Sequence, residues 1–193
     1  MTERLRRLTP ADLDDAQRAV YDSIVGGPRA RGTQLFPLAD SAGALAGPFG
    51  LMLHAPELGA PLQELGAAIR YRTTLSDRSR EIAILLVAAA THSEFERYAH
   101  ERLGRTAGLS EDELTGLRSE SFTSPDPGEN AVAALSTALL RGESLDDDEY
   151  AHVAGILGDR QVLEVTVLVG YYRTLAQMLD VFGVGGPDED SPR

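Results

Sequence analysis

The chain has 193 residues and no cysteine, and its 18 basic and 30 acidic residues give a formal net charge of −12 at pH 7. The lack of cysteine excludes disulfide scaffolds, thiolate metal sites, cysteine nucleophiles and dithiol redox cycles. The negative charge argues against nucleic acid and anionic membranes as partners. The N-terminal residues have no apolar signal core, and no apolar run is long enough to span a bilayer. We therefore expect a cytoplasmic protein with a single domain over residues 1–193, in which residues 1–9 and 185–193 are flexible.

The N-terminal part of the chain predicts two helices separated by a long irregular segment. Apolar residues at helical spacing predict a helix that begins at Thr9 and Pro10 and stops before Gly26. Residues 26–50 are rich in glycine, alanine and proline and show no sustained period, so we expect a passive connector or a lid over a site, with short helical pieces. A second helix is predicted over about residues 56–72.

The next two predicted helices carry the candidate chemistry. The first begins after Ser76 and contains the run Ile82–Ala90, which is apolar on all sides and should therefore lie at the centre of a bundle. Ser93, followed three residues later by Glu96, has the pattern of a capping box and predicts the start of another helix, which ends at Gly108.

The C-terminal part of the chain is also helical in pattern. Ser110 begins a further start signal, and later helices are predicted over about residues 129–141, 145–157 and 159–182. No segment has the pattern of a β-strand. The predicted fold class is therefore all-α, a compact helical bundle of about seven to eight helices.

Three ionisable residues form the candidate site. Glu96 and His100 are four residues apart on one predicted helix, so their side chains share a face, and Glu81 introduces the apolar helix before them. Two carboxylates and an imidazole in a poorly hydrated place would shift each other's proton affinity, as general acid–base chemistry requires.

Simpler roles for these residues stay open at this point. Glu96 can serve as the capping-box glutamate, His100 as its ion-pair partner on a solvated surface, and Glu81 as a charge at a helix N-terminus. Glu96 and His100 could also chelate an ion with Glu81 or His92. Because no complete ligand set is fixed, we predict no metal.

The identity and spacing of these residues resemble a motif of the carboxymuconolactone decarboxylase superfamily, which includes the AhpD-type alkyl hydroperoxidases. Redox members of that family have a glutamate, eleven residues, Cys-x-x-Cys, three residues and a histidine. The same frame here runs from Glu81 through Ser93 and Glu96 to His100, so both cysteine positions are altered. The decarboxylase branch similarly has a glutamate four residues before the histidine. Further segments that look like non-thiol members are Val20–Ile24, Gly27–Arg29, Gly47–Phe49, Leu65–Gly66, Arg70–Arg72 and Gly170–Tyr172.

The resemblance implies an AhpD-like α-bundle that assembles as dimers, trimers or hexamers and needs no cofactor. The central and last helices also have apolar residues on more than one face, which independently favours self-association into a homo-oligomer. A thiol peroxidase needs a thiolate to attack peroxide and a second thiol to resolve the product, and serine cannot replace them at neutral pH. We therefore expect no thiol peroxidase activity, whereas decarboxylation needs no sulfur.

The leading hypothesis is a cofactor-independent lyase or isomerase that acts on a small carboxylated or lactone-like substrate. His100 would reprotonate the substrate or stabilise its oxyanion, with Glu96 positioning the imidazole and Glu81 tuning the pair. The candidate substrate-binding residues are Ser93, Arg29, Arg70, Arg80 and Phe49. The alternative is a non-catalytic oligomeric scaffold or small-molecule binder that has lost the family redox centre.

Overall fold

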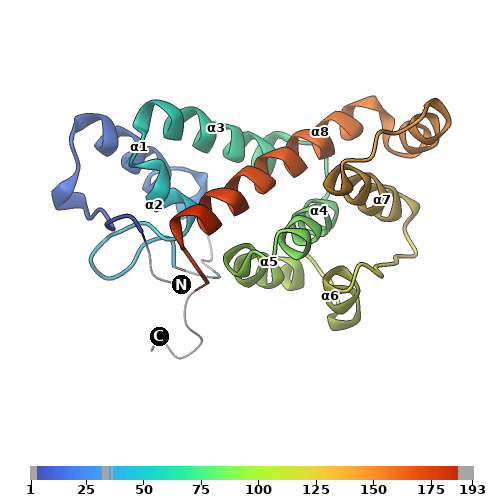
Figure 1. The fold of residues 1–193 in the computed structure, drawn as a ribbon, viewed down its shortest axis with the longest axis horizontal. Helices are drawn as coiled ribbons and strands as arrows, with labels where there is room; N and C mark the ends of the chain where they lie inside the picture. The colour runs from blue at the N-terminus through green and yellow to red at the C-terminus, as the bar shows by residue number, and fades with distance from the viewer. Residues whose placement is uncertain (1–3, 32–34, 36, 187–193) are drawn as a thin grey trace. The chain divides into compact units, whose positions relative to one another are not determined.

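The structure is a computed structural model that describes residues 4–31, 35 and 37–186. In these residues it has eight α-helices, two short 3₁₀ helices and, in place of a β-sheet, an isolated bridge between Ala39 and Leu45 (Figure 1). The predicted all-α class is confirmed. The helices are η1 (Pro10–Asp12), α1 (Asp15–Val25), η2 (Pro28–Ala30), α2 (Pro48–Met52), α3 (Pro56–Arg72), α4 (Asp77–Ala90), α5 (Glu94–Thr106), α6 (Glu111–Arg118), α7 (Pro127–Arg141) and α8 (Asp147–Phe182).

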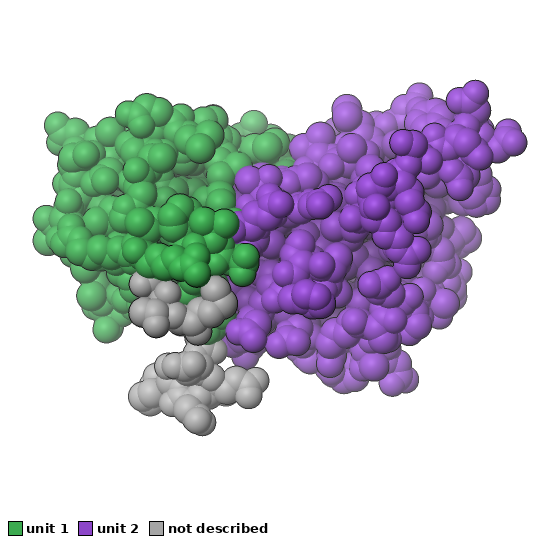
Figure 2. Space-filling view, viewed as in Figure 1, with its two compact units in different colours: residues 1–72, 178–193 green, residues 73–177 purple. Residues whose placement is uncertain are grey.

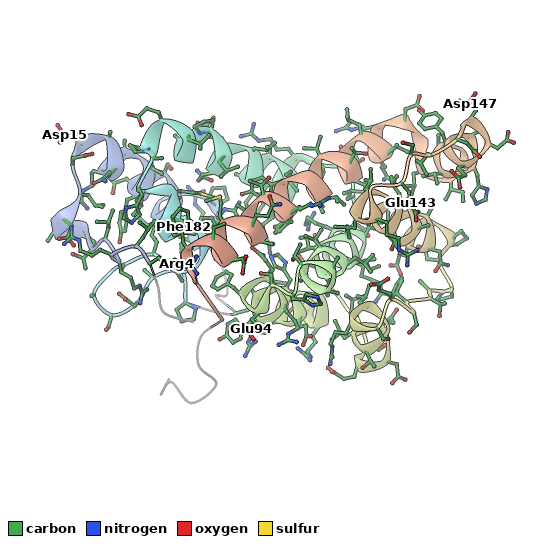
Figure 3. The ribbon with its side chains drawn as sticks, viewed as in Figure 1. Arg4, Asp15, Glu94, Glu143, Asp147 and Phe182 are labelled. Atoms are coloured by element: carbon green, nitrogen blue, oxygen red, sulfur yellow. The ribbon has the colours of Figure 1, made fainter. Side chains whose placement is uncertain are left out.

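The chain divides into two compact units (Figure 2). The first unit comprises residues 1–72 and 178–193, and the second comprises residues 73–177. Helix α8 contributes to both of them. The expectation of a single domain stays a prediction. Of the ends expected to be flexible, residues 1–3 and 187–193 lie outside the described residues. Within the first unit, Arg4 is held beside Phe182 by a bond from its backbone N–H to the Phe182 carbonyl oxygen at 2.9 Å (Figure 3).

The start of the first predicted helix is corrected. Thr9 and Pro10 begin only the short η1, in which the Thr9 backbone N–H donates to Asp12 at 2.9 Å. Helix α1 begins later, after Asp14, whose carboxylate accepts from the Gln17 backbone N–H at 2.8 Å while the Gln17 side chain accepts from the Asp14 N–H at 3.1 Å. This reciprocal cap satisfies N–H groups that a helix start leaves free, so α1 starts there.

The second unit is built around α4. Ser76 caps this helix by accepting from the Ser79 backbone N–H at 3.0 Å. Residues 82–88 are almost fully buried, and α4 packs against α5, α6 and α7 (Figure 1). The prediction that the apolar run lies at the centre is therefore confirmed for this unit.

Arg78 fixes α4 to its neighbours. Its Nε lies 2.7 Å from Oε1 of Glu129 on α7, and its Nη2 lies 2.6 Å from Oε1 of Glu113 on α6. Its Nη1 also donates to the Gly108 carbonyl oxygen. One guanidinium thus holds three segments around the N-terminal turn of α4, where Glu81 follows.

Helix α8 is two helices joined at Gly158. This glycine has φ 75° and ψ 153°, far from helical values, and the break agrees with the predicted boundary between residues 157 and 159. In the described part of the chain, none of the helices is both long enough and apolar enough to cross a membrane.

Candidate acid–base site

A short turn brings the candidate residues of α4 and α5 together. After α4 ends at Ala90, His92 adopts a positive φ of 52° and the Ser93 backbone N–H donates to the Ala88 carbonyl oxygen at 3.0 Å. Ser93 then caps α5 by accepting from the Glu96 backbone N–H at 3.4 Å. The chain therefore returns alongside α4, and the middle of α5 comes to face the first turns of α4.

His100 lies between two carboxylates. Its Nδ1 is 2.6 Å from Oε2 of Glu81, and its Nε2 is 3.3 Å from Oε2 of Glu96. The exposed fraction is 2% for each glutamate and 6% for the histidine. We call these three residues the Glu–His–Glu cluster. The structure brings these three candidate residues together, and the roles assigned to them stay predictions.

The simpler roles that the sequence left open do not describe this geometry. Ser93 and Glu96 form only half of a capping box, because the Glu96 carboxylate points to His100 and the Ser93 N–H bonds elsewhere. His100 is buried and does not form a surface ion pair. Glu81, expected to tune the pair, makes the shorter of the two contacts with the imidazole.

One carboxylate oxygen of the cluster lacks a donor. Oε1 of Glu96 is buried and has no hydrogen-bond partner among the described residues. Leaving a buried carboxylate oxygen unsatisfied is costly, so native structures seldom keep one without a reason. A substrate that presents an acidic proton or a hydroxyl group would satisfy it.

The environment of His100 favours its charged form. Burial alone lowers the pKa of the imidazole, but the charge and hydrogen bond of Glu81, followed by those of Glu96, outweigh burial and raise the pKa from 6.5 to about 9. An opposite charge at contact distance favours the charged form of the imidazole. The imidazole is therefore protonated at neutral pH and can act as an acid.

Helix α8 supplies an aromatic wall that the sequence analysis did not assign to the site. The Tyr172 ring meets the His100 ring edge-on, with centroids 5.1 Å apart and an interplanar angle of 88°. Tyr171 makes a similar contact with Tyr172 at 5.3 Å. Both tyrosines are buried. Their only sequence signal was the resemblance of Gly170–Tyr172 to the family.

The candidate substrate-binding residues fall into both units. Ser93 acts as the α5 cap. The Arg29 guanidinium lies 4.9 Å from the ring centroid of Phe49, and these two residues belong to the first unit together with Arg70. Arg80 is buried in α4, immediately before Glu81, in the second unit. Arg80 therefore lies on α4, the helix that also carries Glu81.

Two other features of the second unit bear on function. Within the described ranges, no group of three histidine or acidic side chains could hold a metal ion. A hollow of about 580 Å³ is lined mainly by α7 and the first part of α8. The Glu–His–Glu cluster is not part of its lining.

The chain is similar to known proteins in sequence and in fold. Residues 56–138 match the family described as "Carboxymuconolactone decarboxylase family". No curated protein matches the sequence. Among solved structures, the chain is similar to an alkylhydroperoxidase AhpD core, an uncharacterized peroxidase-related protein from Ralstonia eutropha JMP134. The two share 16% identity with a TM-score of 0.73, over 97% of this chain and 93% of that one.

Two further solved structures share the fold. The debrominase Bmp8 in complex with 2,3,4-tribromopyrrole is 12% identical with a TM-score of 0.70, over 95% of this chain and 91% of that one. A protein of unknown function from Agrobacterium tumefaciens, described as AhpD of antioxidant defence, is 20% identical with a TM-score of 0.59, over 70% of this chain and 94% of that one. The predicted AhpD-like fold is confirmed.

Proposed function

The segment of residues 56–138 belongs to the carboxymuconolactone decarboxylase family, and from this premise we propose that the protein is a cofactor-independent lyase or isomerase. Its substrate is a small carboxylated or lactone-like molecule, and its proton-transfer centre is the Glu–His–Glu cluster. The observation that carries the proposal is the buried imidazole held between two carboxylates, at 2.6 and 3.3 Å. A thiol peroxidase cycle has no thiol to use, because the sequence contains no cysteine.

The proposed decarboxylation needs a proton donor, which His100 supplies. The bond between the substrate carbon and its carboxylate breaks, carbon dioxide leaves, and the electron pair moves into a conjugated carbonyl group as a dienolate. His100, protonated at neutral pH because of its raised pKa, stabilises the developing oxyanion or returns a proton to carbon. Solvent then reprotonates the imidazole.

Glu96 suits the complementary role in an isomerisation. Its unpartnered Oε1 can accept a proton from a carbon next to the substrate carbonyl. His100 on the other oxygen of the same carboxylate then donates a proton at a different atom. The two reactions share one cluster and differ in whether carbon dioxide is lost. The fold itself accommodates small rings, since the similar Bmp8 is described in complex with a tribromopyrrole.

The test measures carbon dioxide release and solvent deuterium incorporation on a panel of lactone acids. His100→Gln should reduce either rate about 100-fold or more, since a positioned acid or base contributes about 10²–10⁴. His152→Gln, at an exposed histidine of the same unit, is the matched control and should retain the wild-type rate. A wild-type rate in His100→Gln, or no reaction across the panel, would contradict the proposal.

The non-catalytic binder or scaffold remains the second candidate. It rested on Glu96 as a cap and His100 as its surface partner, and the buried geometry removes both supports. The remaining support for this second candidate is exposed apolar surface, which favours self-association. We propose that the chain self-associates through α8, where Leu163 and Val167 are exposed one turn apart. The apolar run of α4 does not support self-association, because its residues 82–88 are buried.

A further inference from the structure

The imidazole of His100 meets side chains of three helices in the second unit. Glu81 of α4 lies 2.6 Å from Nδ1, Glu96 of α5 lies 3.3 Å from Nε2, and the Tyr172 ring of α8 stands edge-on to the imidazole, with centroids 5.1 Å apart. The two carboxylates meet the imidazole at its nitrogens. Tyr172 meets it as a second ring, at an interplanar angle of 88°, so it restrains the imidazole in a different way.

We infer that Tyr172 is a positioning residue, whose ring keeps the imidazole of His100 turned so that Nε2 faces Glu96. His100 is the proton donor of the proposed reaction, so the catalytic meaning of this role rests on the proposed function. The orientation of the imidazole does not depend on that function and can be measured without a substrate.

The two carboxylates restrain the imidazole unequally. The contact at Nδ1, at 2.6 Å, is short, whereas the contact at Nε2, at 3.3 Å, lies just beyond the usual range of about 2.7–3.2 Å for a hydrogen bond between nitrogen and oxygen. The side-chain torsion that turns an imidazole is broad, so torsional preference does not hold the ring either. The ring could therefore swing about its bond to Glu81 and carry Nε2 away from Glu96.

Tyr172 can block this swing because it is itself fixed. Its side chain is buried, and the buried Tyr171 packs edge-on against it, with centroids 5.3 Å apart and an interplanar angle of 85°. Edge-to-face pairs with centroids about 4.5–7 Å apart are favoured by the charge distribution of aromatic rings. The three rings therefore form a row in which Tyr171 supports Tyr172, and Tyr172 supports His100.

A role in packing alone makes a different prediction. In that case the removal of Tyr172 would weaken the fold and leave the interaction between Glu96 and His100 unchanged. A positioning role predicts that this interaction is itself lost. A double-mutant cycle of Tyr172 and Glu96 separates the two, because the effect of a cavity or of entering water on the imidazole is common to both members of each pair.

The experiment measures the pKa of His100 by NMR titration of its ring protons, with and without Glu96→Gln, in wild type, Tyr172→Leu and Tyr172→Phe. In wild type, Glu96→Gln should lower this pKa, because the carboxylate raises it. In Tyr172→Leu the decrease should be less than half as large, since the imidazole no longer faces Glu96. Tyr172→Phe keeps the ring and should restore the full decrease.

Two further variants serve as controls. Leu135→Ala removes a buried side chain of α7 in the same unit and should destabilise the fold, but it should leave the effect of Glu96→Gln as in wild type. Tyr172→Met fills much of the same space with a flexible side chain and should behave as Tyr172→Leu does. It therefore keeps the test available if the leucine variant does not fold.

Three results would overturn the inference. They are the absence of any effect of Glu96→Gln in wild type, an undiminished effect in Tyr172→Leu, and an equal loss of the effect in Tyr172→Phe, which would assign the role to the hydroxyl group.

Turnover separates this inference from the proposed function. With a substrate that reacts, Tyr172→Leu should lower kcat about 10-fold or more with little change in KM, since displacing a catalytic group by about 1 Å can cost about 100-fold. An effect of Glu96→Gln that depends on Tyr172, without turnover of any substrate in the panel, would refute only the proposed function. Turnover that depends on His100 and is as fast in Tyr172→Leu as in wild type would refute only the role of Tyr172.

Discussion

Nδ1 of His100 lies 2.6 Å from Oε2 of Glu81, which ties the middle of α5 to the first turns of α4. A bond of this length between a buried imidazolium and a carboxylate is charge-assisted and strong. It directs the Nδ1 proton to Glu81, so that Nε2, facing Glu96, carries the other proton. We therefore expect Glu81 to orient the ring, and the proton on the Glu96 side to be the one that leaves.

The stability of the protein should depend on pH through His100. Because folding raises the pKa of the imidazole from 6.5 to about 9, its stabilising contribution is complete below pH 6.5 and is lost as pH rises through 9. The contribution is on the order of 3 kcal/mol, at about 1.4 kcal/mol per pKa unit. Urea unfolding of wild type and His100→Gln should show a stability difference that narrows by about this amount between pH 6 and pH 10. A difference that stays constant over this range would contradict the shift.

The two carboxylates should affect His100 unequally. Glu81→Gln and Glu96→Gln each remove a negative charge that raises the pKa of the imidazole, and Glu81 is the larger influence. NMR titration of the ring protons should therefore show a lower pKa in both variants, with the greater decrease for Glu81→Gln. The exposed Glu94, at the start of α5 (Figure 3), gives the control: Glu94→Gln should leave the titration within a few tenths of a unit. The reverse order of the two effects would refute Glu81 as the positioning residue.

Sequence periodicity could predict most of this fold for a physical reason. Helix α3 was expected over residues 56–72 and lies there, because caps and helical spacing are local signals. The predicted start of α1 was wrong because Thr9 and Asp14 each begin a reciprocal cap. Between them Leu13 is extended, with φ −80° and ψ 133°, so the helix that Thr9 begins ends after one turn.

The candidate site could likewise be predicted from sequence only where its residues follow local patterns. Helical spacing places Glu96 and His100 on one face, and the family frame adds Glu81. Which glutamate holds the ring more closely depends on the side-chain geometry between α4 and α5. The contact of Tyr172 with His100 likewise arises from tertiary packing of α8 against α5, and it has no helical or capping pattern that could reveal it.

Arg78 should contribute more to stability than any exposed ion pair. Arg78→Met leaves the buried Glu129 without its main partner and should cost about 2–4 kcal/mol, since breaking a buried pair is expensive. Arg141→Met, which breaks a pair with Glu120 that is about half exposed, should cost less than about 1 kcal/mol. Denaturant unfolding provides both values. Adding Glu129→Gln to Arg78→Met should recover part of the loss, and a further loss of the same size would contradict the explanation.

Self-association should depend on the exposed stripe of α8. Leu163 is 64% exposed and Val167, one turn later, is 38% exposed, and such adjacent apolar side chains favour an interface. Leu163→Glu should lower the mass measured by light scattering to that of one 20.7 kDa chain. The control is Leu58→Glu in the first unit, where a leucine is 67% exposed, and it should keep the wild-type mass. A wild type that is monomeric at all working concentrations would refute the proposal.

Two glycines of α8 should respond oppositely to the same substitution. Gly158 has φ 75° and ψ 153°, a region that essentially only glycine occupies, so Gly158→Ala should destabilise the protein by about 1–3 kcal/mol. Gly155 lies within the helical part of α8, and the space around an added methyl group there is open, as it is at Gly158. Gly155→Ala should therefore stabilise by about 0.5–1 kcal/mol, because alanine loses less backbone entropy on folding.

The comparison of these two variants isolates backbone conformation from packing. Neither new methyl group meets a neighbour, so any difference in unfolding free energy arises from the φ and ψ angles alone. If Gly158→Ala were as stable as Gly155→Ala, α8 would be able to continue through residue 158 as one straight helix. The break at Gly158 would then not be required by the fold, and the segment Asp147–Leu157 could change its direction relative to α7 at little cost.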